Sequence, residues 1–345
     1  MTKIVADRAI PFLEGVFEPY GVQLVQKDGR EITRDDLLDA DVLITRTRTR
    51  CDAALLEGTA VKLIATATIG TDHIDLPWCS ANGIDIASAP GCNAGGVMDY
   101  VFSALYGIAS RKGINLDGRV LGVVGVGHVG GKVTIMARQL GFEVLCYDPP
   151  RAAAEGPDGF CELDYLLDHA SIVTLHTPLD ETTRGMANAD FFARMQPGTI
   201  FINSSRGEVV NEEALLEALP KLGAVVIDTW CNEPDINRRL LDRVDIATPH
   251  IAGYSYQGKQ NGTAAAVRAV ARHLGISDLY SFFPPLLGPD DEAIRLEVAG
   301  KNQGEIAALF QYNYPIFTDD FMFRVDPDGF ERLRAGYRYR REYYI

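Results

Sequence analysis

Short apolar runs that alternate with helix-like stretches are the feature that most constrains the fold of this 345-residue chain. The runs are nearly continuous and rich in Val and Ile, as expected of strands buried on both faces of a parallel sheet. The stretches between them open with capping residues, such as Thr33 before "RDDLLDA" and Asn211 before "EEALLEAL". This alternation predicts an α/β architecture of doubly wound parallel sheets.

The runs form two series, which predict two sheets. The first series covers residues 3–7, 41–45, 62–67 and 84–89, and the second covers 120–127, 143–148, 171–177, 198–205, 224–230 and 244–250. An apolar stretch at 95–113 predicts a connecting helix, and residues 257–274 predict a helix that returns the chain to the first sheet. We therefore expect one domain over residues 1–94, completed by about 257–284, and a second over residues 95–256.

The composition changes at about residue 285, after which Tyr, Phe and charged residues dominate up to the final "RLRAGYRYRREYYI". This part is short for an independent domain. We predict that residues 285–345 form a small α+β element. It either contacts another subunit or packs as a tail on the same subunit.

The net charge of -14 argues against general binding to nucleic acid or to an anionic membrane. It leaves room for an anionic small-molecule substrate, because one site can be locally positive in an acidic protein. No apolar run is long enough to cross a bilayer, and the first residues lack a signal-peptide pattern. The six cysteines include no C-x-x-C pair, which favours free thiols and no metal site. We expect a cytoplasmic protein.

A glycine motif follows the first run of the second series, as Gly125-x-Gly127-x-x-Gly130. A strand before it and a helix-like stretch after it are the context in which this motif binds a dinucleotide. Gly125 permits a tight turn, Gly127 lets a pyrophosphate approach, and Gly130 lets the helix pack on the strand. His128 and Val129 then lie at the helix N-terminus, where N–H groups face the phosphates.

Asp148 stands at the end of the next run, in "YDPPR". A carboxylate there accepts hydrogen bonds from the ribose hydroxyls of NAD and repels the additional phosphate of NADP. Nearby Arg151 is the one feature that suits NADP. The position of the acid at the strand end favours NAD as the cofactor.

Three later strand ends carry Arg206, Glu233 and His250. Ligands of parallel α/β sheets bind beyond the carboxyl ends of the strands, so these residues fall on the same edge as the glycine motif. Oxidation of a 2-hydroxy acid needs a base that titrates near neutrality, which is the property of histidine. A carboxylate orients such an imidazole, and a planar guanidinium binds a carboxylate through bidentate hydrogen bonds. These roles fall on His250, Glu233 and Arg206.

The motifs "GVGHVG" (125–130), "YDPPR" (147–151), "HTPL" (176–179), "SSRGEVV" (204–210), "DTWCNEP" (228–234) and "TPHIAGYS" (248–255) resemble those of the D-2-hydroxyacid dehydrogenases. The resemblance implies a Rossmann-type NAD domain, a flavodoxin-like substrate domain and Arg206, Glu233 and His250 as the catalytic set. The final residues resemble a C-terminal dimerisation module found in one branch of that family. The implied reaction is the oxidation of a phosphorylated 2-hydroxy acid with NAD by a homodimer.

By position, the resemblance also assigns contacts to individual residues. It implies substrate contacts at Thr47, Thr68 and Tyr254. It implies NAD contacts at Asp148, Thr177, Ser204, Ser205, Arg206, Asp228 and Gly253.

The stretch "TRTRTRC" (45–51) places three arginines in alternation after a strand. If the strand persists, Arg46, Arg48 and Arg50 lie on one side, where they would suit a substrate that carries both a carboxylate and a phosphate. Arg46, nearest to the strand end, is the best candidate. Arg48 and Arg50 have the equally good alternative of a solvated basic edge.

Two other functions remain open on the sequence. One is another dehydrogenase of the same family, acting on 3-phosphoglycerate or on glyoxylate and hydroxypyruvate. The other is an NAD(H)-sensing binding protein that uses its surface, as some transcriptional co-repressors do. The complete set of Arg206, Glu233 and His250 argues against the second alternative.

Overall fold

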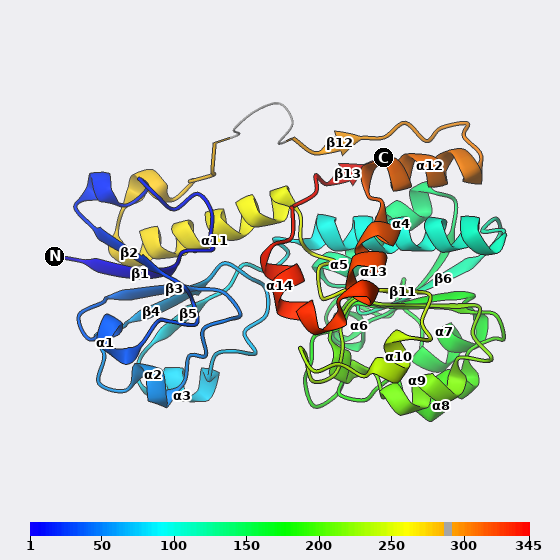
Figure 1. The fold of residues 1–345 in the computed structure, drawn as a ribbon, viewed down its shortest axis with the longest axis horizontal. Coiled ribbons are helices and arrows are strands. Elements are labelled where there is room, and N and C mark those ends of the chain that lie inside the picture. Colours follow the sequence, from blue (N-terminus) through cyan, green and yellow to red (C-terminus); the bar gives the residue numbers. More distant parts are fainter. Residues whose placement is uncertain (286–291) are drawn as a thin grey trace. The chain divides into compact units, whose positions relative to one another are not determined.

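The computed structural model describes residues 1–285 and 292–345. The described chain divides into two compact units (Figure 1). Unit 1 comprises Met1–Asn93 and Ser255–Glu292, and unit 2 comprises Ala94–Tyr254 and Ala293–Ile345. The C-terminal residues after Ala293 therefore cluster with the second series of strands. The predicted boundary at about residue 285 adjoins residues 286–291, which lie outside the described residues.

Unit 1 contains a parallel five-stranded sheet in the order β2-β1-β3-β4-β5. This is the flavodoxin-like order, with its switch point between β1 and β3. The strands are β1 (Lys3–Asp7), β2 (Gln23–Lys27), β3 (Val42–Thr45), β4 (Leu63–Thr66) and β5 (Asp85–Ala87). The helices are α1 (Arg34–Leu37), α2 (Ala53–Leu56), α3 (Leu76–Ala81) and α11 (Tyr256–Leu274), with 3-10 turns at Glu18–Tyr20 and Ser277–Leu279.

The two faces of this sheet bury separate apolar cores. On one face, α11 supplies Ala266, Val267, Val270 and Ala271 against Ile4 and other strand residues. On the other face, residues of α1, α2 and α3 pack on the remaining strand side chains. Both faces are covered, which is why the inner strands β3 and β4 are apolar runs without alternation.

Unit 2 contains a parallel six-stranded sheet in the order β11-β10-β9-β8-β6-β7. Its switch point lies at β6, which β7 and β8 flank. The strands are β6 (Val120–Val124), β7 (Glu143–Tyr147), β8 (Ile172–Leu175), β9 (Ile200–Asn203), β10 (Ala224–Ile227) and β11 (Ile246–Ala247). The helices are α4 (Ala94–Lys112), α5 (His128–Gln139), α6 (Pro149–Glu155), α7 (Leu163–His169), α8 (Ala189–Arg194), α9 (Glu212–Ala218) and α10 (Arg238–Leu241), with a 3-10 turn at Gly207–Val209.

The C-terminal part of unit 2 is a small α+β element. It contains α12 (Gln303–Asn313), α13 (Ile316–Val325), α14 (Phe330–Ala335), a 3-10 turn at Pro327–Gly329 and a short parallel pair of β12 (Ile294–Arg295) and β13 (Tyr343–Tyr344). Phe310 of α12 and Tyr343 of β13 join the core that α4 and α5 form, and Phe323 and Phe330 join the core on the other face. Figure 1 shows α12 running along α4. The predicted fold class is confirmed.

The structure corrects two details of the sequence prediction. The strand Gln23–Lys27 was not predicted, because it lies at the edge of its sheet and its polar, partly exposed residues do not form an apolar run. Most of the predicted strands also end earlier than their apolar runs. The run at 120–127 forms a strand only to Val124, for example, and the remaining residues turn into a loop.

Candidate active site

The glycine motif forms a tight turn between β6 and α5. Gly125 has a φ of 85°, which favours glycine, and a Cβ there would lie 2.8 Å from the carbonyl of His176 at the end of β8. A Cβ on Gly130 would lie 2.0 Å from the Gly125 carbonyl oxygen, so this glycine lets α5 pack on the turn. A Cβ on Gly127 would meet no atom within 4 Å. Each geometry agrees with the role that the motif predicts.

The surroundings of this turn fit a dinucleotide. Helix α5 begins after Gly127, which offers no side-chain cap, so its first N–H groups and its dipole are available to an anion. His128, the first helical residue, is exposed, and Val129 is half-buried. The hydroxyl oxygens of Thr177 and Ser204, at the ends of β8 and β9, are buried without a hydrogen-bond partner among the described residues. Buried hydroxyls normally have partners, so these two suit polar groups of a ligand.

Asp148 follows β7 and caps α6. Its Oδ1 accepts a hydrogen bond from the backbone N–H of Arg151 at 3.0 Å, and its Oδ2 accepts one from Val126 at 2.8 Å. The carboxylate is thereby held beside the glycine turn. The guanidinium of Arg151 donates to Glu155 at 2.7 and 2.6 Å and to the Val126 carbonyl at 2.7 Å. Its charge is therefore balanced by a carboxylate, which weakens the argument for NADP.

Arg206 follows β9 in a loop that requires glycine at the next position. A Cβ on Gly207 would lie 1.9 Å from the carbonyl carbon of Trp230, so the loop packs directly against the backbone after β10. The side chain of Asn203 fixes the loop, because it accepts from the N–H and hydroxyl of Ser205 and donates to the Arg206 carbonyl. Ser205 itself is buried.

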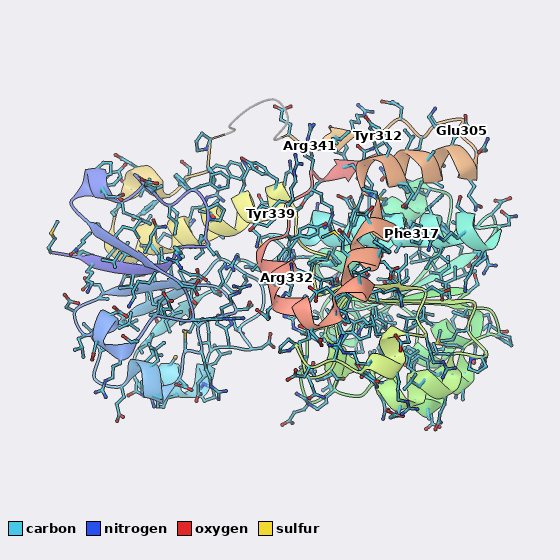
Figure 2. The ribbon with its side chains drawn as sticks, in the orientation of Figure 1. Glu305, Tyr312, Phe317, Arg332, Tyr339 and Arg341 are labelled. Atoms are coloured by element: carbon cyan, nitrogen blue, oxygen red, sulfur yellow. The ribbon has the colours of Figure 1, made fainter. Side chains whose placement is uncertain are left out.

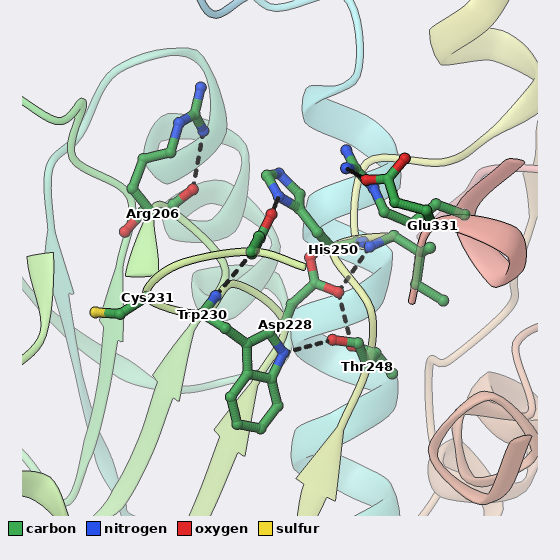
Figure 3. A network of polar contacts seen from close by, with 12 residues as sticks. Arg206, Asp228, Trp230, Cys231, Thr248, His250 and Glu331 are labelled. Atoms are coloured by element: carbon green, nitrogen blue, oxygen red, sulfur yellow. Dashed lines mark hydrogen bonds and ion pairs between the residues drawn. The ribbon is translucent and has the colours of Figure 1, made fainter. Parts of the chain in front are cut away.

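Glu233 and His250 form a hydrogen-bonded pair after β10 and β11 (Figure 3). Glu233 Oε2 accepts from His250 Nδ1 at 2.7 Å, and its Oε1 accepts from the Trp230 N–H at 2.9 Å. The two side chains are 20% and 28% exposed. Because Nδ1 is hydrogen-bonded to a carboxylate, which can only accept, Nδ1 carries a proton. The other ring nitrogen, Nε2, is then the atom that can act as a base.

The electrostatics of this pair favour an ionised carboxylate. Burial raises the pKa of Glu233, but the charge of His250 and its hydrogen bond outweigh burial and hold the pKa below its usual value. Trp230, which orients Glu233 through its backbone and donates its indole N–H to the Thr248 carbonyl, was not among the predicted site residues. The sequence gives no chemical signal for a residue that acts through its main chain.

His250 also has an unusual backbone. Its φ of 56° lies in the left-handed region, which is uncommon for a residue with a side chain and is seen mostly where surrounding contacts enforce it. Asp228, only 1% exposed, supplies some of these contacts. Its carbonyl accepts from the His250 N–H at 2.7 Å, and its carboxylate accepts from the N–H groups of Ile251 and Ala252 at 2.8 and 2.9 Å.

Gly253 and Tyr254 continue the same loop. Both are half-buried, and the rings of Tyr337 and Tyr339 lie 5.9 and 6.3 Å from that of Tyr254. The structure thus brings Arg206, Asp228, Glu233 and His250 together at one edge of the unit 2 sheet, on the side to which the glycine turn also belongs.

Unit 1 carries the other predicted residues. Thr47 is exposed just after β3, and the Thr68 hydroxyl lies 2.7 Å from that of Thr66 at the end of β4. The condition for placing the three arginines on one side, a strand that persists beyond Thr45, is not met. Strand β3 ends at Thr45, and the chain then leaves the extended conformation. Arg46 turns inward and is 9% exposed, with its Nε 3.3 Å from Asp7 Oδ2. Arg50 is exposed and pairs with Asp52.

In residues 1–285 and 292–345, the six cysteines are free thiols, and no three His, Cys, Asp or Glu side chains are arranged to hold a metal ion. Within the same ranges, no helix is both long and apolar enough to span a membrane.

The chain is similar to known proteins in both sequence and fold. Residues 105–252 match the family model "D-isomer specific 2-hydroxyacid dehydrogenase, NAD binding domain". The chain is 42% identical over 349 residues to the erythronate-4-phosphate dehydrogenase of Ectopseudomonas mendocina, covering 98% of this chain and 92% of the relative. It is 41% identical over 346 residues to the Bacteroides fragilis enzyme of the same name, covering 99% and 97%. Among solved structures, NAD+-bound 3-phosphoglycerate dehydrogenase of Entamoeba histolytica matches with a TM-score of 0.67, 25% identity and coverage of 79% and 95%.

The fold and the matched domain define an NAD-binding α/β protein of the dehydrogenase type, as predicted. The chain belongs to the D-isomer specific 2-hydroxyacid dehydrogenase family and, within it, to the erythronate-4-phosphate dehydrogenases.

Proposed function

We propose that this protein oxidises 4-phospho-D-erythronate to 2-oxo-3-hydroxy-4-phosphobutanoate with NAD, as a step of pyridoxine biosynthesis. The observation that carries the proposal is the Glu233–His250 pair, held at 2.7 Å on the sheet edge that also carries Arg206 and the glycine turn. The near full-length similarity to erythronate-4-phosphate dehydrogenases supports this substrate over other 2-hydroxy acids.

His250 is the proposed base. Its Nε2 takes the proton of the C2 hydroxyl while the hydrogen on C2 departs as hydride and C2 becomes a carbonyl. NAD, when bound, supplies the hydride acceptor. Glu233 keeps the proton on Nδ1 and stabilises the imidazolium that forms, and the Trp230 N–H holds the carboxylate in place. The same residues return the proton in the reverse direction.

Arg206 is the proposed clamp for the substrate carboxylate, because a guanidinium presents two parallel N–H groups to a carboxylate. Its Nη1 donates to the Ser205 carbonyl at 2.9 Å, which fixes the direction of the fork. We further propose that Arg46, Thr47, Thr68 and Tyr254 contact the substrate. Of these four residues, Arg46 has its charge paired with a carboxylate, that of Asp7.

NAD is held, in this proposal, by the residues around the glycine turn and the neighbouring strand ends. Asp148 accepts from the ribose hydroxyls, and the unpartnered hydroxyls of Thr177 and Ser204 bind polar groups of the cofactor. The remaining proposed contacts are those of Gly125, Gly127, His128, Val129, Gly130, Ser205, Asp228 and Gly253.

We also propose a cytoplasmic homodimer, assembled through the C-terminal element. That element exposes large apolar side chains on α12 and α13, including Tyr312 at 88%, Phe321 at 66% and Val325 at 67% (Figure 2 labels Tyr312). Phe321 and Val325 are four residues apart and so share a helix face. Sedimentation of the wild type beside Phe321→Asp tests this assembly. A wild-type monomer would refute it.

The function is tested by supplying NAD with 4-phospho-D-erythronate, 3-phosphoglycerate or D-lactate and following NADH and keto-acid formation, with a 2-oxo acid acceptor in parallel. We expect selective oxidation of the first substrate. Turnover of another acid alone would retain the mechanism and reject the substrate. NAD binding without turnover of any acid would favour the sensing protein instead.

A further inference from the structure

The loop that carries the proposed base is held by two buried charged side chains. Figure 3 shows Asp228 and the backbone that follows His250 within one network of polar contacts. Asp228 binds the N–H groups of Ile251 and Ala252, as described above. The carbonyl groups of the same loop point to a different partner, which comes from the last residues of the chain.

That partner is Arg340, which lies in the segment after α14 between the labelled residues Tyr339 and Arg341 (Figure 2). Its Nη1 donates to the carbonyls of Ile251 at 3.2 Å and Tyr254 at 3.1 Å. Its Nη2 donates to the Ala252 carbonyl and, at 2.8 Å, to the Gly96 carbonyl in the first turn of α4. One planar guanidinium thus ties three loop carbonyls to a long buried helix.

Arg340 is built into the protein and is not a surface side chain. It is 9% exposed, and its guanidinium lies 4.0 Å from the ring centroid of Tyr314. Tyr337, three residues earlier, adds its hydroxyl at 3.3 Å. A buried cation is costly unless its donors are satisfied, so its position follows from the carbonyls that it binds.

The geometry of the loop explains what this arrangement accomplishes. The left-handed backbone of His250 is unfavourable and persists only if the flanking peptide groups are over-determined. Asp228 fixes the N–H groups and Arg340 fixes the C=O groups of the residues that follow. The peptide groups of the loop therefore lie between a buried anion, Asp228, and a buried cation, Arg340, and supply part of the hydrogen bonds that each charge needs.

We infer that Arg340 is a positioning residue for the reaction: it fixes the loop 250–254 so that His250 Nε2 and Tyr254 keep the orientation that turnover requires. The C-terminal element is therefore part of the active-site scaffold of unit 2, in addition to any role in dimerisation. The kinetic part of this inference rests on the proposed function, whereas its structural part does not.

The test compares the full-length wild type with Arg340→Met, Arg340→Lys and the control Arg338→Met. Arg338 is two residues away and exposed, so its loss removes the same charge from the same segment. Turnover of 4-phospho-D-erythronate, NAD affinity and hydrogen exchange of the peptide spanning 250–254 are measured on each folded protein. Exchange reports the loop directly, because Asp228 protects the amides of Ile251 and Ala252.

We expect Arg340→Met to lower kcat by about 100-fold, the typical cost of a misplacement of about 1 Å. Loop exchange should become at least about tenfold faster, as a local opening requires. Arg340→Lys, with one ammonium in place of the fork, should lose about tenfold in kcat, and it serves if the methionine variant fails to fold. Arg338→Met should match the wild type.

Two results would overturn the inference. One is a folded Arg340 variant with wild-type kcat and wild-type loop exchange. The other is a variant whose exchange rises throughout unit 2 while its kcat per folded molecule is unchanged, because that is general destabilisation. A wild type that turns over no hydroxy acid would reject the proposed function instead, and the exchange measurement would still decide whether Arg340 holds the loop.

Discussion

The first five strands of each unit have the same parallel order, but different groups lie at the switch points of the two sheets. In unit 1 the strands β1 and β3 end at Asp7 and Thr45, and the buried ion pair of Asp7 with Arg46 occupies the place where the strand order reverses. In unit 2 the corresponding place, at β6 and β8, holds the glycine turn against the backbone of His176. One switch point carries a pair of compensating charges, and the other presents helix N–H groups to a ligand.

Titratable residues at the strand ends differ in the same way. Arg46 and Asp7 have side chains that are 11% and 2% exposed, whereas His250 and Glu233 are 28% and 20% exposed. A charged residue at the carboxyl edge of a parallel sheet is therefore not evidence of chemistry by itself. Exposure and the choice of partner separate a structural ion pair from an acid–base pair.

The largest effect should come from the half-buried Glu233–His250 pair of unit 2. We expect His250→Ala to lower kcat by about 10³-fold, because the proton acceptor is lost while the NAD site is untouched. Steady-state kinetics and calorimetric NAD titration measure the two quantities. His273→Ala, an exposed histidine of α11, is the control and should be unaffected. Substantial turnover by the His250 variant would refute its assignment as the base.

The buried pair of unit 1 should affect stability instead. We expect Asp7→Ala to lower the free energy of unfolding of unit 1 by about 3–5 kcal/mol, because it leaves the Arg46 cation buried and unpaired. Urea unfolding followed by Trp78 fluorescence, in a Trp230→Phe background, reports on unit 1. Addition of Arg46→Met should restore most of the loss. The exposed Asp39→Ala is the control, and equal effects of Asp7 and Asp39 would contradict the comparison.

A smaller effect is expected at the proposed clamp. Arg206→Lys keeps the charge but loses one arm of the fork, so kcat/KM should fall by about 10- to 100-fold, the worth of one hydrogen bond to a charged group. The measurement is initial rates over a range of 4-phospho-D-erythronate concentrations. Lys substitution at exposed Arg239 provides the control. Wild-type kcat/KM in Arg206→Lys would reject two-pronged binding of the carboxylate.

The smallest effect concerns the half-buried Lys27–Asp36 pair of unit 1. Partial burial raises the pKa of Asp36, but hydrogen bonds from Lys27 and Thr33 lower it to about 2. Since the unfolded pKa is about 3.9, the contribution to stability is present above that pH and is lost as the pH falls to about 2. Asp36→Asn should cost about 1 kcal/mol at neutral pH, and this cost should disappear as the pH falls below about 2. A pH-independent difference in urea midpoints would contradict this linkage.

Much of this structure follows from local sequence patterns. Buried parallel strands must be apolar on both faces, so the runs revealed both sheets, and the turn at Gly125 requires a glycine that the motif displays. The edge strand β2 escaped prediction because its residues are exposed or half-buried and do not form an apolar run. The inward turn of Arg46 escaped because nothing local to "TRTRTRC" indicates Asp7, which lies on another strand.

The sequence by itself determined the two parallel sheets, the family, the glycine turn between β6 and α5 and the residue types on which the chemistry is proposed to rest. These depend on periodicity and on short motifs, which are local properties. Only the tertiary structure decided that Arg46 is buried in an ion pair and that Arg340, 86 to 89 residues along the chain from the loop it binds, contacts the residues after His250. Such contacts depend on where distant segments meet, and the Arg–Tyr pattern of the C-terminus carries no local trace of the carbonyl groups that it binds.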